Sequence, residues 1–155
     1  MRSWKPATAT FLALSLALAG CATVPTGPQA RYATITDERL TGMETEMIGR
    51  VYFSQDERTL TSTADSLVEA YADLFNGRDA GKNIVLAGHA SGEGDAAYSQ
   101  KISLDRTAAV ADGLVKHGVV ANRISIIAYG ETRPEMAASN GNAPSLNRRV
   151  EVYTY

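Results

Sequence analysis

The chain has 155 residues and a formal net charge of −2 at pH 7, from 15 basic and 17 acidic side chains. This balance argues against a nucleic-acid partner, because binding to a phosphate backbone needs a marked excess of Lys and Arg. Cys21 is the single cysteine, which excludes an intramolecular disulfide and makes a cysteine-ligated metal site implausible. The length suits one domain that is held together by packing alone.

The first 20 residues differ from the rest of the chain. Arg2 and Lys5 precede an uncharged, largely apolar run at residues 7–20, ATATFLALSLALAG, which is typical of a secretory signal peptide. The run is shorter than the roughly 20 apolar residues that a membrane-spanning helix needs. We expect residues 1–20 to be removed, which leaves 13 basic against 17 acidic side chains and a formal charge of −4.

The end of this segment, LAGC at residues 18–21, resembles the bacterial lipobox, in which the cysteine thiol accepts a diacylglyceryl group. Cleavage would then leave Cys21 as the lipidated N-terminus. The alternative is an ordinary signal peptide followed by a chance cysteine. In enterobacterium-like sorting an Asp after the lipidated cysteine favours the inner membrane. Ala22 stands there instead, which points to the outer membrane, with the domain facing the periplasm.

The next residues connect the anchor to the domain. Residues 22–30, ATVPTGPQA, are small, contain Pro and Gly and lack apolar periodicity, so we expect a flexible tether. Residues 31–50 are ambiguous, because they would either add a short strand or extend the tether. We place the lipidated cysteine and tether at residues 21–45 and the globular domain at residues 46–155.

Strands and helices alternate from residue 51 onward. Short β-prone runs at 51–54, 84–87, 124–129 and 150–155 predict four strands. In the last run, residues 150, 152 and 154 would face one side of the sheet and residues 151, 153 and 155 the other.

Two amphipathic helices separate these strands. The first carries apolar residues at positions 60, 64, 67, 71 and 74 and ends near Gly77, and the second begins at Asp95 as its N-cap and closes at Gly118. The order βαβαββ predicts an α+β fold, a two-layer sandwich of helices on a mixed four-stranded sheet. We expect Leu67 and Ile126 to lie in its core.

Five short segments carry a family resemblance. They are residues 51–53 with Leu60 following, IVLAGHA at 84–90, ISLDR at 102–106, AYGETRP at 128–134 and NRRVE at 147–151. In this order they resemble the OmpA-like C-terminal domain family, especially the peptidoglycan-associated lipoproteins. The resemblance implies an OmpA-like domain that grips the peptidoglycan stem peptide, chiefly its diaminopimelate residue, without cleaving it.

Such a ligand end carries a carboxylate and an ammonium, so its site needs an arginine fork and an acidic acceptor. The motif position of Arg106 implies the carboxylate partner, Arg148 a supporting cation, and Asn147 lies beside it. Arg148 and Arg149 are adjacent on a strand and face opposite ways, so at least one of them should be plain surface.

This chain departs from the family at the acidic position. The family reads GHTD or GHAD, whereas here Ser91 follows GHA, and Ser99 replaces a family asparagine. Serine accepts a hydrogen bond but brings no charge, which lowers affinity by roughly 10- to 150-fold if nothing compensates. Glu93 or Asp95 could supply the charge, although Asp95 fits better as the helix cap. The implied peptidoglycan-binding residues are Asp56, Ala90, Ser91, Ser99, Arg106, Asn147 and Arg148.

These expectations give two functional hypotheses. The first is an outer-membrane lipoprotein that binds peptidoglycan non-covalently and tethers the membrane to the cell wall. The second is an envelope interaction lipoprotein, with possible protein partners, whose peptidoglycan binding is weakened or lost. We expect no enzymatic activity, cofactor or metal. His89 fits a strand-end residue that ties the turn together better than it fits a ligand or a catalytic base.

Overall fold

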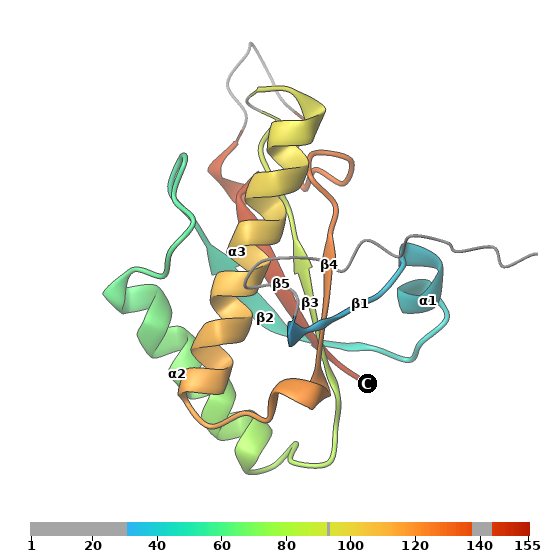
Figure 1. Cartoon of the computed structure of the whole chain (residues 1–155), viewed down its shortest axis with the longest axis vertical. Helices are drawn as coiled ribbons and strands as arrows, with labels where there is room; N and C mark the ends of the chain where they lie inside the picture. The colour runs from blue at the N-terminus through green and yellow to red at the C-terminus, as the bar shows by residue number, and fades with distance from the viewer. Residues whose placement is uncertain (1–30, 93, 138–143) are drawn as a thin grey trace, which may run out of the picture.

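Two long helices cover one face of a five-stranded sheet in the computed structural model, which describes residues 31–92, 94–137 and 144–155 (Figure 1). The helices are α2, Ser62–Asn76, and α3, Ala96–Lys116. The strands are β1 (Ala33–Thr34), β2 (Glu46–Tyr52), β3 (Ile84–Gly88), β4 (Ile124–Ala128) and β5 (Arg149–Thr154).

The sheet is mixed, with the strand order β1-β4-β3-β5-β2. β1, β4 and β3 pair in parallel, whereas β5 is antiparallel to both β3 and β2. The α+β sandwich expected from the sequence is therefore confirmed, and the two-residue edge strand β1 is added to the four expected strands. Short 3-10 helices, η2 (Ala121–Arg123) and η3 (Ser145–Asn147), precede β4 and β5.

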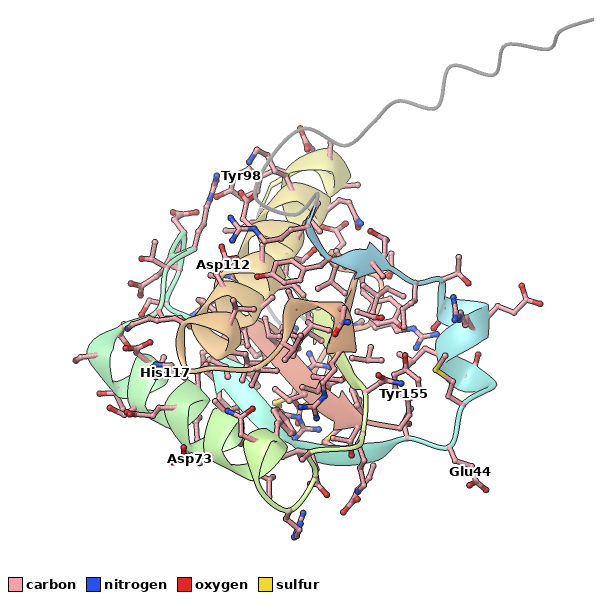
Figure 2. All side chains as sticks on the ribbon, turned by 60° about the horizontal axis from the view of Figure 1, so that its bottom comes forward. Glu44, Asp73, Tyr98, Asp112, His117 and Tyr155 are labelled. Atoms are coloured by element: carbon pink, nitrogen blue, oxygen red, sulfur yellow. The ribbon has the colours of Figure 1, made fainter. Side chains whose placement is uncertain are left out.

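Residues 31–45 pack on the domain, so the expected tether boundary at residue 45 lies too late in the chain. Tyr32 and Ile35 are each only 5% exposed, and the Tyr32 hydroxyl donates a 2.6 Å hydrogen bond to Asp112 on α3. The short helix α1, Asp37–Thr41, lies on the side of the sheet away from α2 and α3 (Figure 2). The folded part begins by residue 31 because these apolar side chains complete both faces of the sheet.

The core lies between the helices and the sheet. Ile126 and Val152 are fully buried there, as the strand alternation predicts. The expectation for Leu67 is wrong, because its residue is 39% exposed and α2 instead buries Val68, Ala72 and Phe75. The stripe read from positions 60, 64, 67, 71 and 74 runs along one edge of the buried face and not along its centre.

Side chains and glycines define the helix ends where the sequence places them. Thr61 caps α2, Gly77 follows its last residue, and the Asp95 carboxylate accepts a 2.7 Å hydrogen bond from the Tyr98 amide at the start of α3. Gly118 follows α3 with a φ of 95°. Within the described ranges, neither helix is long and apolar enough to cross a membrane.

Candidate functional site

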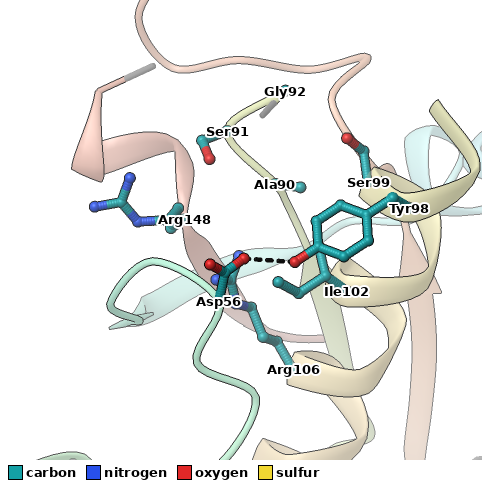
Figure 3. A pocket seen from close by; sticks show the side chains of 9 residues that line it. All are labelled: Asp56, Ala90, Ser91, Gly92, Tyr98, Ser99, Ile102, Arg106 and Arg148. Atoms are coloured by element: carbon teal, nitrogen blue, oxygen red, sulfur yellow. Dashed lines mark hydrogen bonds between the residues drawn. The ribbon is translucent and has the colours of Figure 1, made fainter. Parts of the chain in front are cut away.

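The end of β3 approaches α3 so closely that only glycine fits there. A Cβ atom on Gly88 would lie 2.0 Å from Thr107 Oγ1 and 2.4 Å from the Ser103 carbonyl oxygen. This contact holds the loop after β3 near the N-terminal half of α3. The loop and α3 both line a pocket, with Ala90 of the loop between Ser99 of α3 and Arg148 (Figure 3).

The pocket combines loops after β2 and β3 with α3 and the start of β5. It is lined by Asp56, Ala90, Ser91, Gly92, Tyr98, Ser99, Ile102, Arg106 and Arg148. Six of the seven residues implied by the sequence therefore meet at one place. The free interior is about 10 Å³, roughly the space that one water molecule requires.

Arg106 lies at the base of the pocket and is held by backbone atoms. Its residue is 1% exposed, and its Nε and Nη2 atoms donate hydrogen bonds of 2.8 and 2.9 Å to the carbonyl oxygens of Glu57 and Ser54. The guanidinium carbon lies 5.4 Å from the centre of the Phe53 ring. Burial, together with the neighbouring charge of Arg148, lowers the pKa of Arg106 to about 10, so it stays a cation at neutral pH.

The Arg106 guanidinium is thus a buried cation in a fixed orientation. No described carboxylate forms an ion pair with it. A planar guanidinium of this kind suits an incoming carboxylate, because its fork matches the two oxygens.

Asp56 and Tyr98, two residues that line the pocket, are hydrogen-bonded to each other. The Tyr98 hydroxyl donates a 2.5 Å hydrogen bond to the Asp56 carboxylate (Figure 3). Asp56 has a φ of 55°, an unusual conformation for a residue other than glycine. The Arg58 guanidinium lies 5.6 Å from the Tyr98 ring centre. The bond links the loop after β2 to the first turn of α3, and both of its residues line the pocket.

The family's acidic position remains without charge in this pocket. Ser91 lines the pocket, and Ser99, which is 1% exposed, donates a 2.7 Å hydrogen bond to the carboxylate of Glu131. Asp95 is engaged as the helix cap, as expected. Glu93, the other compensating acid considered from the sequence, lies outside the described residues, as does Cys21.

Asn147 does not line the pocket. Its side-chain oxygen accepts hydrogen bonds from the amides of Glu135 and Met136, and its amide group donates to the Met136 carbonyl oxygen. It therefore holds the loop after β4 against η3. The motif places this asparagine beside the site for a structural reason.

Neither member of the arginine pair is plain surface, contrary to expectation. Arg148 lines the pocket, whereas Arg149 is 5% exposed and its Nε donates a 2.9 Å hydrogen bond to Glu151. A carboxylate oxygen of Glu151 also lies 3.3 Å from Nε2 of His89. Burial alone would raise the pKa of the Glu151 carboxyl, but the hydrogen bonds to it outweigh burial, so its pKa lies below the usual range. His89 Nδ1 donates to the Arg133 carbonyl oxygen at 3.1 Å, which agrees with its expected structural role.

Sequence reasoning missed Tyr98, Ile102 and Glu131. The signal was available for the first two, because Tyr98, Ile102 and Arg106 recur every four residues and so share one face of α3. Glu131 carried no such signal, since its approach to Ser99 depends on how the loop after β4 packs.

A model described as the OmpA family matches residues 52–148. The chain belongs to the OmpA family. This membership confirms the resemblance drawn from the five motifs.

Relatives of this OmpA-family chain include two kinds of protein. Outer membrane porin F of Pseudomonas fluorescens is 35% identical over 66% of this chain, but the match covers only 31% of the porin. The peptidoglycan-associated lipoprotein of Rhizobium meliloti is 28% identical over 90% of this chain and 82% of that protein. The crystal structure of the peptidoglycan-associated lipoprotein from Burkholderia pseudomallei shares the fold, with a TM-score of 0.63 and 20% identity over 68% of this chain and 89% of that one.

Proposed function

We propose that this OmpA-family protein is an envelope lipoprotein whose domain binds the stem peptide of peptidoglycan without cleaving it. A lipid on Cys21 would anchor it in the outer membrane, so that the bound domain tethers that membrane to the cell wall. Relatives that cover most of the chain are named peptidoglycan-associated lipoproteins, which supports this assignment.

The observation that carries the proposal is the environment of Arg106. A guanidinium this buried is costly unless it is paired, and here backbone carbonyl oxygens fix it without neutralising its charge. Arg148 adds a second cation at the same pocket. A ligand carboxylate would meet both charges, which is the chemistry that the terminal carboxylate of diaminopimelate offers.

A short tether would keep this domain near its membrane. The nine residues 22–30 separate Cys21 from the first described residue, and a chain of that length would span about 30 Å if it were fully extended. The described residues begin close to β1, at the edge of the sheet. This edge would therefore remain within about 30 Å of the lipid anchor.

The closed pocket favours one alternative, an envelope interaction protein with weak or no peptidoglycan binding. Ser91 lacks the family's charge, and the Tyr98–Asp56 hydrogen bond leaves little free interior. Binding of a stem peptide would therefore require this bond to open, and the apparent affinity would be the affinity of the open form multiplied by the fraction of molecules that are open.

Cosedimentation of the full chain with purified sacculi tests the proposal. We expect the wild type and the exposed-arginine control Arg39→Ala to pellet with sacculi, and Arg106→Lys to remain mostly in the supernatant. Lysine keeps the charge but lacks the fork, so it separates carboxylate recognition from simple attraction. Failure of the wild type to pellet would contradict the proposal and favour the interaction protein.

A further inference from the structure

We propose that Glu131, acting through the hydroxyl of Ser99, provides the negative end of the pocket and selects ligands that carry an ammonium beside their carboxylate. This inference rests on the proposed function and identifies how the same site replaces the acid missing at Ser91. The group that reaches the ligand is Ser99, and Glu131 is a positioning residue behind it.

The hydrogen bond between Ser99 and Glu131 has a defined direction. Ser99 Oγ lies 2.7 Å from Glu131 Oε2, and because the carboxylate can only accept, the hydroxyl donates its proton to Glu131. Ser99 lines the pocket, so the lone pairs of its oxygen remain as acceptors for a donor inside it. A hydroxyl polarised by a carboxylate is a stronger acceptor than a hydroxyl alone.

The backbone next to Glu131 is held in place by close contacts with α3 and with the loop after β3. Gly130 has a φ of 55°, and a Cβ atom there would lie 3.0 Å from Gln100 Oε1 and 3.2 Å from the backbone nitrogen of Gln100. The carbonyl oxygen of Gly130 also accepts a 2.7 Å hydrogen bond from the Ala90 amide. These contacts join the loop after β4 to α3 and to the loop after β3. They therefore hold the Glu131 carboxylate beside Ser99.

The positive and negative charges of the pocket lie on different sides. Glu131 is half-buried, and no described cation forms an ion pair with it. A Cβ atom on Gly92 would lie 3.5 Å from Glu131 Oε2, so the Glu131 carboxylate is also close to the loop after β3. In Figure 3, Arg148 and Ser99 lie on opposite sides of the pocket, with Ala90 between them. The site therefore has a cationic side and an anion-backed side, as a zwitterionic amino-acid end requires.

Two soluble ligands that differ in a single group test this inference. One is a stem tripeptide ending in diaminopimelate, and the other is the same peptide ending in 2-aminopimelate, which lacks the distal ammonium. Calorimetric titration of the full chain measures both affinities for the wild type, Glu131→Gln, Ser99→Ala, Asp56→Asn and the exposed control Glu44→Gln.

We expect the wild type and Glu44→Gln to prefer the diaminopimelate peptide by about 10-fold, as for a charge-assisted hydrogen bond. Glu131→Gln and Ser99→Ala should each reduce that preference to about 2-fold or less, with little change for the 2-aminopimelate peptide. The inference is overturned if both variants keep the preference, if they weaken both ligands equally, or if only Asp56→Asn removes it. The absence of any wild-type binding would instead overturn the proposed function itself.

Discussion

Arg106 is tied to the loop after β2 by a 2.9 Å hydrogen bond from its Nη2 atom to the carbonyl oxygen of Ser54. The same side chain would both hold this loop in place and receive the ligand carboxylate. Stability and binding are therefore coupled at this position. A substitution there will affect the shape of the pocket as well as its charge.

Arg106→Ala should abolish sacculus binding and lower the free energy of unfolding by about 3 kcal/mol. Two hydrogen bonds that the charged guanidinium donates to carbonyl oxygens are lost, and each contributes about 1.5–3 kcal/mol before the loop relaxes. Urea unfolding followed by circular dichroism measures the stability, and cosedimentation measures the binding. An alanine variant as stable as the wild type would show that the guanidinium does not hold the loop.

Ile126→Ala should cost about 2–5 kcal/mol, because the side chain is fully buried in the core of the sandwich. Leu67→Ala should cost less than about 1 kcal/mol, since that residue is 39% exposed. The pair forms a matched comparison in urea unfolding. Equal losses at the two positions would contradict the orientation of α2.

The contrast between Ile126 and Leu67 shows which buried positions can be predicted from the sequence. Strand residues alternate strictly, so Val150, Val152 and Ile126 could be assigned to the helix-facing side of the sheet. Helical stripes are broader, and a reading that is displaced by one residue, such as Leu67 for Val68, still gives an acceptable pattern.

The same limit applies to the site. Motif positions suggested that Arg106, Ser91 and Ser99 share one site, and the structure places all three in the lining of one pocket, because their elements follow from local patterns. The position of Glu131 depends on non-local packing of the loop after β4, and the role of Asn147 depends on its partners in that loop. Neither the position of Glu131 nor the role of Asn147 can be predicted from the spacing of residues in the sequence.

Ser91→Asp should strengthen binding to sacculi by about 1–3 kcal/mol, because a carboxylate would then face the ligand ammonium. The gain should shrink as salt is added, since the opening of the pocket is exposed to solvent. It should be larger in a Glu131→Gln background, where the carboxylate behind Ser99 is removed. If Glu93 already supplies the charge, Ser91→Asp would gain little and Glu93→Gln would become the damaging change.

Glu151 should make the fold sensitive to acid. Its buried carboxylate lies among His89, Arg149 and Tyr153, and these partners hold its pKa below the usual value of 4.5 despite burial. A lowered folded-state pKa gives stability that is complete above the unfolded pKa and is lost as the pH falls below it. Urea midpoints at pH 7 and pH 3.5 measure this loss, and Glu151→Gln should make the difference smaller. A pH dependence that is the same in both proteins would contradict the assignment.

Cys21 is predicted to carry the lipid anchor. Cells labelled with a palmitate analogue should incorporate it into the wild type and not into Cys21→Ala. Incorporation into the alanine variant, or none into the wild type, would remove the basis for membrane tethering while leaving the binding domain unaffected.

The central claim is that the pocket around Arg106 binds the stem peptide, and an NMR titration of the isotope-labelled chain with a diaminopimelate-ending tripeptide tests it most directly. We predict saturable amide shifts that centre on Ser91, Ser99 and Arg106, together with shifts at Asp56 and Tyr98 as their hydrogen bond opens. The peptide should leave the amides of α1 and the C-terminal end of α2 unchanged. Saturable shifts elsewhere on the domain, or no shifts at millimolar peptide, would contradict the account.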